Sequence, residues 1–170
     1  MHSNCGHGSI VCFDPIVDSK TKFLILGTLP SPESLKTGQY YKKSNNCFWK
    51  IIYALYEQSP STNYGDKCAF LLEHNIGVWD VLRYALRNGS SDADIHNAEP
   101  NDFDMFFKKY PNIKGILFNG KEAEEQFRTH FPVLIKSIRY ERVLSTSGAL
   151  AKPFNVKLEN WKNAIKRLNQ

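Results

Sequence analysis

The chain has 170 residues, of which 42% are hydrophobic and 23% charged, with a net charge of +5. These values are typical of a folded globular protein with a sizeable core, and they exclude a disordered or collagen-like chain. No run approaches 18 apolar residues, and the N-terminus lacks the apolar region of a signal peptide. We therefore expect a cytoplasmic protein, or a nucleoid-associated one if its source is prokaryotic. The modest positive charge favours a polyanionic partner.

The first predicted element is a buried strand over residues 22–28, and a loop without hydrophobic periodicity follows it as far as Trp49. A loop of this length in a compact domain is either functional or disordered. Its adjacent tyrosines, Tyr40 and Tyr41, argue against disorder because exposed aromatic rings need a surface on which to stack. We therefore expect a functional loop.

The next elements follow from the spacing of apolar residues. Phe48, Ile51, Ile52 and Leu55 fall at i, i+3, i+4 and i+7, which predicts a helix over 46–57. The remaining predicted elements are, in order, a helix over 66–73, a strand over 76–82, an irregular polar segment over 87–100, a helix capped by Asn101 with Phe103, Phe106 and Phe107 on its inner face, a strand over 113–118, a helix over 120–131, a strand over 138–144 and a helix from about residue 155.

Strands that alternate with helices predict a parallel sheet between helical layers, joined by right-handed crossovers. The predicted fold is therefore a single α/β domain over residues 1–170, a three-layer sandwich with a central, mostly parallel four-stranded sheet flanked by helices. No repeat or shift in composition marks a second domain.

The carboxyl ends of parallel strands lie at one edge of the sheet, where ligands bind. Three segments meet there: the loop after Leu26, Asn119 with Gly120, and residues 145–148. Their side chains are mainly hydroxyls and amides, which bind phosphates, read hydrogen-bonding edges and position water but supply no strong base. Glu33 is the acidic exception, and a surface position in the loop is expected for it.

The sequence lacks the common motifs of metal sites and of nucleotide-binding sites. The four cysteines form no C-x-x-C pair, and their spacings match no common zinc or iron–sulfur framework. The set most similar to a metal site consists of Cys5, His7 and Cys12, with His2 nearby. Chance proximity near a terminus explains it better than metal binding does. There is also no G-x-G-x-x-G after a strand and no G-K-[ST] motif. We expect no metal and no cofactor.

Several motifs together resemble the uracil-DNA glycosylase superfamily, specifically its hypoxanthine-DNA glycosylase branch. They occur in family order from about residue 10 to the end, and five in order are far more specific than any one alone. The motifs are G-T-L-P-S-x-x-S-L with x-G-Q-Y-Y and N-x-F-W (27–49), G-V-W-D-V-L (77–82), R-N-G-S-S-D-A-D-I with N-D-F (87–103), I-L-F-N-G (116–120) and L-S-T-S (144–147).

The resemblance implies a monofunctional DNA repair enzyme that flips a deaminated base, hypoxanthine above all, out of DNA and hydrolyses its N-glycosidic bond. Such a bond breaks through an oxocarbenium-like sugar and an anionic base, so preorganised dipoles can stabilise the charge without a titrating base. Base flipping needs a basic surface, an aromatic platform and a group that reads the base edge. The expected partner is DNA containing deaminated bases, bound by a monomer that does not associate with membranes.

The resemblance assigns the chemistry to two asparagines. Asn46, in the N-x-F-W motif, matches the catalytic asparagine that positions water or stabilises charge at the sugar; a plain helix cap is the alternative. Asn119 matches the asparagine that reads the base, and an Asn-Gly turn is the alternative. Many relatives have an acid or amide directly after the first strand, where this chain has Thr28 and Leu29. The acid or amide of the first motif is therefore absent, which argues against an inherited carboxylate mechanism.

The other implied residues contact the flipped base or the DNA backbone. Tyr41 matches the aromatic residue that stacks on the base, with Tyr40 as its rival. Ser31, Ser145, Thr146, Ser147, Leu150 and Lys152 match positions near the DNA, and Lys36, Lys42 and Lys43 flank the same loops. Where the family continues with Pro-Ala-Asn, this chain has Gly148-Ala149-Leu150, which makes Leu150 a candidate to fill the vacated base position. Trp79 and Phe103 are expected in the core, and Asp80 is expected to make structural hydrogen bonds.

Two other functions fit the same fold. A glycosylase with uracil as its main substrate presents the same motifs, and so does a non-catalytic domain that binds nucleic acid. The Gly148-Ala149-Leu150 departure permits the second.

Overall fold

The computed structural model describes residues 8–89 and 91–170. The candidate metal ligands Cys5, His7 and His2 lie outside the described residues. No helix within the two described ranges is both long and apolar enough to cross a membrane.

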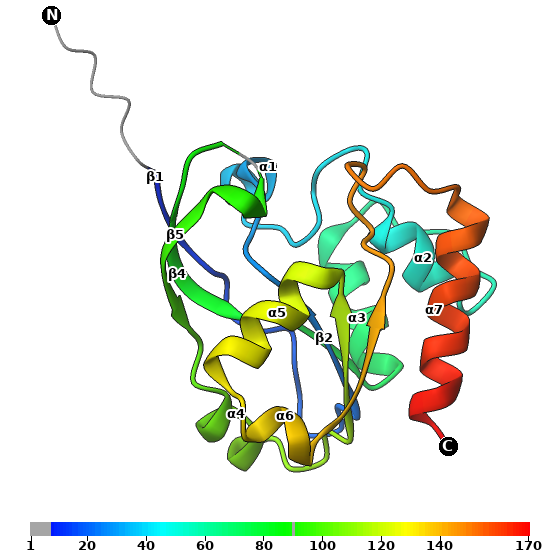
Figure 1. Cartoon of the computed structure of the whole chain (residues 1–170). Coiled ribbons are helices and arrows are strands. Elements are labelled where there is room, and N and C mark those ends of the chain that lie inside the picture. The colour runs from blue at the N-terminus through cyan, green and yellow to red at the C-terminus, as the bar shows by residue number, and fades with distance from the viewer. Residues whose placement is uncertain (1–7, 90) are drawn as a thin grey trace, which may run out of the picture.

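A four-stranded parallel sheet forms the centre of the fold, as predicted. Its strands are β2 (Phe23–Gly27), β3 (Ile76–Asp80), β6 (Gly115–Asn119) and β7 (Arg139–Val143), in the order β3-β2-β6-β7. Every neighbouring pair is parallel, so all four carboxyl ends lie at the same edge. This edge is the upper one in Figure 1.

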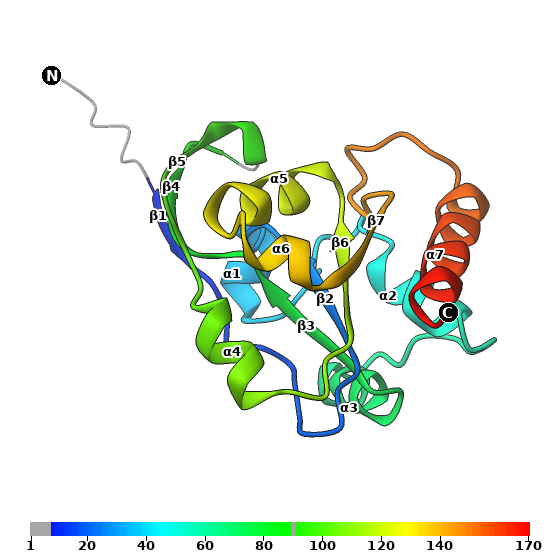
Figure 2. The same ribbon diagram turned by 60° about the horizontal axis from the view of Figure 1, so that its bottom comes forward.

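Helices cover both faces of this sheet, which confirms the predicted three-layer arrangement (Figures 1 and 2). One face packs against α2 (Phe48–Ala54), α3 (Tyr64–Glu73) and α7 (Phe154–Leu168), with Trp161 fully buried among them. The helices on the other face are α4 (Phe103–Lys109), α5 (Lys121–His130) and α6 (Leu134–Ser137). Phe103 is buried there, as predicted.

A second, antiparallel sheet lies beside the first and was missed by sequence reasoning. It consists of β1 (Gly8–Val11), β4 (Leu82–Arg87) and β5 (Ile95–Pro100) in the order β1-β4-β5, with a short 3-10 turn, η1 (Asp92–Asp94), between β4 and β5. The prediction that residues 87–100 are irregular is therefore wrong. β5 is mainly exposed or half-buried, and a strand of this kind has a polar composition that hides it in the sequence.

The long loop after β2 contains a helix that the sequence analysis did not predict, α1 (Pro32–Thr37). Ser31 caps it by accepting a hydrogen bond from the Ser34 N–H at 3.1 Å, and Gly38 ends it with φ 64°. A serine cap, a proline at the first helical position and a left-handed glycine are typical helix boundaries. With only six residues, the helix is too short to show an apolar period.

The predicted cap of α4 is displaced by one residue. Asp102, not Asn101, caps this helix by accepting from the Met105 N–H at 2.9 Å. Asn101 is buried instead, and its Nδ2 donates to the Asp80 carbonyl at 2.8 Å. The prediction that Asn101 caps α4 is therefore wrong, and its amide joins the start of α4 to the carboxyl end of β3.

Candidate active site

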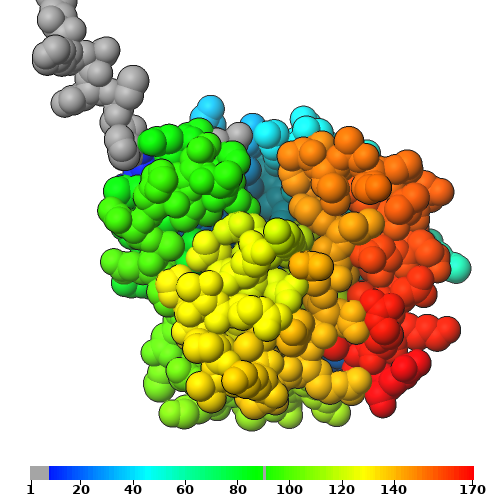
Figure 3. Space-filling model, in the orientation of Figure 1, coloured from blue at the N-terminus to red at the C-terminus, as the bar shows by residue number. Residues whose placement is uncertain are grey.

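A cavity of about 530 Å³ opens at the carboxyl edge of the parallel sheet. Figure 3 shows the hollow between the green, yellow and orange parts of the surface. Its volume is suitable for one small ligand. Most of the predicted site residues line it: Ser31, Tyr40, Tyr41, Asn46, Asn119, Ser145, Thr146, Ser147 and Leu150. Lys152 is exposed and does not line this cavity.

The amide of Asn119 is fixed by Thr146 at both of its atoms. The Thr146 N–H donates to Oδ1 at 3.0 Å, and Nδ2 donates to the Thr146 hydroxyl at 2.9 Å. A backbone N–H can only donate, so it determines which end of the amide is oxygen. One acceptor position on Oδ1 and one N–H on Nδ2 are left for a ligand.

Asp80, Gly27 and Asn119 form one row across the end of the sheet. Gly27 pairs with Asp80, and Leu26 pairs with Phe118, so Asn119 lies beside Gly27 on the next strand. Residues in register across parallel strands point to the same face of the sheet. The row therefore faces the side covered by α2 and α7, and Gly27 leaves open space between the two polar side chains.

Tyr41 lies over this row and has an unusual backbone conformation. Its φ is 56°, in the left-handed region that bulky residues rarely adopt, and its ring stacks on Phe48 with centroids 3.8 Å apart. Tyr41 also lines the cavity. Tyr40, in contrast, is buried in the core, and its hydroxyl donates to the Asp14 carbonyl at 3.0 Å. This placement favours Tyr41 over Tyr40 as the platform for a base.

Asn46 lies both at the beginning of α2 and on the wall of the cavity. Its Oδ1 accepts from the Phe48 N–H at 3.0 Å, at the beginning of α2, and the residue also lines the cavity. The Cys47 N–H donates to the Thr146 carbonyl at 3.0 Å, which ties this turn to the loop after β7. Capping thus fixes the orientation of an amide that still faces the cavity.

The loop after β7 is held mainly by its own hydroxyls. Ser145 Oγ accepts from the Ser147 N–H, and Ser147 Oγ accepts from the Ala149 N–H, both at 3.2 Å. Thr146 is fully buried, and its polar groups contact Asn119 and Cys47. A direct contact between Thr146 and the DNA backbone, as predicted, does not fit this burial. Thr146 instead positions Asn119.

Two further features hold the same loop in place. The buried Lys157 on α7 donates from Nζ to the Ser147 carbonyl at 2.9 Å. Gly148 lies against the Asn45 side chain, so a Cβ at this position would collide with it. The departure from the family's Pro-Ala-Asn therefore coincides with close packing between the loop and the turn that precedes α2.

Carboxylates also reach the cavity, contrary to the expectation that hydroxyls and amides dominate it. Asp80, Asp92 and Glu122 all line it. Asp80 is buried, and its Oδ2 has no hydrogen-bond partner among the residues that the structure describes. Burial and the nearby Asp92 raise the pKa of Asp80 to about 7, while Arg87 lowers it. The acid directly after G-V-W was the sequence signal for Asp80. Asp92 lies within the R-N-G-S-S-D-A-D-I motif but was not assigned to the site, and Glu122 lies outside every quoted motif.

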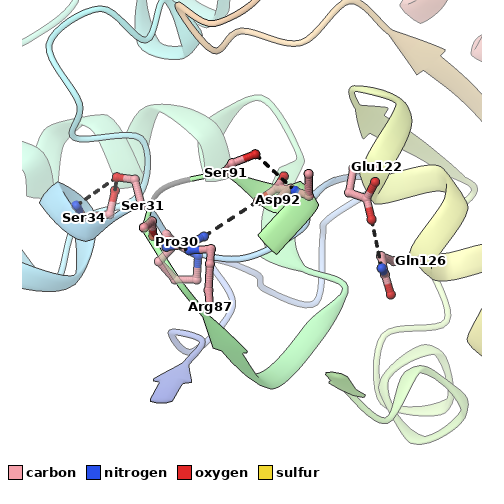
Figure 4. A network of polar contacts seen from close by, with 10 residues as sticks. Pro30, Ser31, Ser34, Arg87, Ser91, Asp92, Glu122 and Gln126 are labelled. Carbon is pink, nitrogen blue, oxygen red and sulfur yellow. Dashed lines mark hydrogen bonds and ion pairs between the residues drawn. The ribbon is translucent and has the colours of Figure 1, made fainter. Parts of the chain in front are cut away.

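Arg87 is a buried cation in the wall of this cavity (Figure 4). Its guanidinium donates from Nη2 to the Pro30 carbonyl at 2.6 Å and from Nε to the Gly89 carbonyl at 3.1 Å, and it lies 3.7 Å from Asp92 Oδ1. Burial raises the pKa of Asp92 and lowers that of Arg87. Arg87 thereby joins the second sheet to the loop that enters α1.

Two residues of the loop after β2 lie close to Arg87, and of these only Ser31 lines the cavity. The Ser31 hydroxyl donates to Ser34 Oγ at 3.1 Å, so the hydroxyl predicted to contact DNA is already used within α1. Glu33 is half-buried, although a surface position was expected, and its Oε2 is enclosed with no partner in the described part of the chain. Its charge acts on Arg87.

A second hollow of about 520 Å³ lies at the amino end of β7. Its charged lining is largely paired within the protein: Arg167 donates to both carboxylate oxygens of Glu141, at 2.9 and 2.8 Å, and Arg139 donates to the Arg167 carbonyl. None of the predicted site residues lines it. The candidate site is therefore the cavity at the carboxyl edge.

The sequence and the structure of the chain both match known proteins of one family. Residues 15–168 match the model of the uracil DNA glycosylase superfamily. Two proteins named hypoxanthine DNA glycosylase are each 34% identical to the chain: one from Methanosarcina barkeri (91% of this chain, 97% of the relative) and one from Methanosarcina acetivorans (91% and 96%). A solution NMR structure from Methanosarcina acetivorans, named as a candidate uracil DNA glycosylase, is similar with a TM-score of 0.80 and 29% identity, over 96% of this chain and all of that one. The predicted resemblance is confirmed: the chain belongs to the uracil DNA glycosylase superfamily.

Proposed function

We propose that this protein is a monofunctional DNA glycosylase that removes hypoxanthine from deoxyinosine in DNA and leaves an abasic site, using one domain that spans the chain. The observation that carries this proposal is the fixed amide of Asn119 in a cavity the size of one small ligand. Two relatives of 34% identity bear the name hypoxanthine DNA glycosylase, which supports the choice of base.

Base recognition follows from the two free positions on the Asn119 amide. Hypoxanthine presents a donor, N1–H, beside an acceptor, O6, and these match the free Oδ1 lone pair and the free Nδ2 hydrogen. Adenine presents an acceptor beside an amino donor, which would oppose like groups and leave them unpaired. The undamaged parent base is therefore rejected. Uracil shows the same donor–acceptor pair as hypoxanthine, so the amide alone does not separate these two substrates.

Bond cleavage needs stabilisation of charge and a placed water. The free positions on the Asn46 amide face the cavity and suit either task, because its orientation is fixed by the Phe48 N–H. Tyr41 supplies the aromatic surface on which the flipped base stacks. Stacking on an aromatic ring contributes about 1–3 kcal/mol per base.

DNA binding is assigned to the rim of the cavity. Lys43 and Lys121 line it, and Leu150 lies at the same opening, where it can occupy the space that the flipped base vacates. Lys152 is exposed nearby in the chain and suits a phosphate. The backbone N–H groups of residues 145–150 can also donate hydrogen bonds to phosphates of the DNA backbone. We further propose that the protein acts as a monomer in the cytoplasm or nucleoid.

A substrate panel tests the proposed function. Purified protein in excess is incubated with matched duplexes that contain a single deoxyinosine, deoxyuridine, deoxyxanthosine or deoxyadenosine, and alkali then reveals abasic sites. We expect cleavage at deoxyinosine and none at deoxyadenosine. The structural neighbour named as a candidate uracil DNA glycosylase favours deoxyuridine as the second candidate. Cleavage only at deoxyuridine would establish that alternative, and binding without cleavage of any duplex would identify a non-catalytic domain.

A further inference from the structure

Two oxygens in the cavity wall are buried without a hydrogen-bond partner among the described residues. They are the Tyr41 hydroxyl and Oδ2 of Asp80. Buried polar atoms are nearly always satisfied in native proteins, so each exception requires an explanation. Tyr41 belongs to the loop before α2, and Asp80 lies at the end of β3.

Gly27 connects these two residues. A Cβ on Gly27 would lie 2.7 Å from Asp80 Oδ1 and 3.1 Å from the Tyr41 hydroxyl oxygen. Both side chains therefore reach the same point, which is empty because residue 27 has no side chain. The Asp80 carboxyl and the Tyr41 phenol are therefore neighbours across this space. Oδ1 is the carboxyl oxygen nearest to Gly27, and Oδ2 is the one without a partner among the described residues.

The backbone of Tyr41 shows why such a contact is needed. A left-handed φ of 56° is unfavourable for tyrosine and persists only where the surroundings hold it. Phe48 covers one face of the ring, and the next residue is held by a hydrogen bond from the Lys42 N–H to Ser34 Oγ at 3.2 Å. The hydroxyl end of the ring is the part that still lacks a fixed partner within the described chain.

We propose that Asp80 is a positioning residue of this site: its carboxyl accepts a hydrogen bond from the Tyr41 hydroxyl and so holds the Tyr41 ring as the platform for the flipped base. The role toward the base rests on the proposed function. The contact between the two side chains does not, and it is testable without DNA.

The charge on Asp80 makes this contact depend on pH. Arg87 from β4 and Asp92 from η1 act on the carboxyl with opposite effects, and its pKa is about 7. The other titratable groups around it are Cys12, Tyr40 and Tyr41. Burial and the Asp80 charge raise the pKa of Tyr41, and the neighbouring Asn119 amide lowers it by less than they raise it. The phenol therefore keeps its proton and stays a donor. The acceptor therefore changes from carboxylic acid to carboxylate near neutral pH, and the hydrogen bond strengthens as it does.

The direct test is NMR of the full chain labelled with ¹³C at the tyrosine ring carbons. The Tyr41 signal is identified by its loss in Tyr41→Phe. We expect this signal to shift with a midpoint near pH 7 in the wild type and not in Asp80→Asn, which retains an acceptor but does not titrate. Asp104→Asn, an exposed change on α4, is the matched control and should retain the shift. A Tyr41 signal that does not move in the wild type, or that moves equally in Asp80→Asn, overturns the proposal.

Single-turnover excision supplies a second test on the same proteins. Tyr41→Phe and Asp80→Ala should each slow hypoxanthine removal about tenfold, and the double variant should be no slower than either, because both remove the same contact. Asp80→Asn should restore most of the rate. Multiplied effects in the double variant would contradict the proposal. If the wild type removes no hypoxanthine, the proposed function fails while the NMR titration still decides whether Asp80 holds Tyr41.

Discussion

The side-chain amide of Asn119, at the end of β6, is hydrogen-bonded at both Oδ1 and Nδ2 by one residue, Thr146, in the loop after β7. The backbone N–H of Thr146 sets the direction of the amide, and its hydroxyl accepts from the other end. A fixed amide distinguishes a base edge from its reverse, whereas an amide that can rotate by half a turn would accept both. Under the proposed function, specificity therefore depends on Thr146, a residue that the base does not need to touch.

Thr146→Val should weaken discrimination. Valine keeps the shape and the backbone N–H but removes the hydroxyl, so Nδ2 of Asn119 loses its partner. The loss of one partner from a buried polar group costs about 1–3 kcal/mol, which corresponds to about 5- to 150-fold in rate. Single-turnover excision of hypoxanthine measures this loss of rate. Thr146→Ser, which keeps the hydroxyl, should remain close to the wild type; an equal loss in both variants would show that packing rather than the hydroxyl matters.

Asn46 is predicted to act in both stability and chemistry, and two substitutions separate these roles. Asn46→Ala removes the acceptor for the Phe48 N–H, so the free energy of unfolding should fall by about 1 kcal/mol. Asn46→Asp retains an acceptor there and should retain the stability. Urea denaturation measures both. Asn46→Ala should also slow the chemical step by about a hundredfold. An unchanged single-turnover rate in this variant would reduce Asn46 to a cap.

Gly27→Ala should damage the site even though it adds only one methyl group. The new Cβ would lie 2.7 Å from Asp80 Oδ1 and 3.1 Å from the Tyr41 hydroxyl, and both side chains would have to move. Overpacking of this kind costs about 1–3 kcal/mol. We expect a lower midpoint of thermal unfolding and a weaker excision rate. In Gly27→Ala/Tyr41→Phe the loss of stability should be partly relieved, and a double variant no more stable than Gly27→Ala would argue against the collision.

The pKa of Asp80 predicts how stability changes with pH. The folded-state pKa of about 7 lies above the ordinary value of 3.8, so the folded protein binds this proton more tightly than the unfolded chain does. The stabilising contribution is complete below about pH 4 and is lost as the pH rises toward 7. Within this window the wild type should lose up to about 1.4 kcal/mol per pH unit relative to Asp80→Asn. Parallel denaturation curves at pH 4 to 8 check it, and a constant difference between the two proteins would contradict the shifted pKa.

The alternation of strands and helices was enough to predict the parallel sheet and its helical layers, because buried strands and amphipathic helices have strong apolar patterns. β5 and α1 were missed since one is mostly polar and the other is shorter than two helical turns. Asn119 and Tyr41 could be placed from motif order. Their surroundings could not, because Thr146 and Asp80 come close to these residues only when distant segments of the chain fold together.

The most direct measurement compares wild type and Asn119→Ala on one duplex that contains a single deoxyinosine, with enzyme in excess. The wild type should convert the lesion to an alkali-labile site, and Asn119→Ala should do so at least about a hundredfold more slowly while it still binds the duplex. An intact lesion after incubation with the wild type, or equal rates for the two proteins, would contradict hypoxanthine excision through the Asn119 amide.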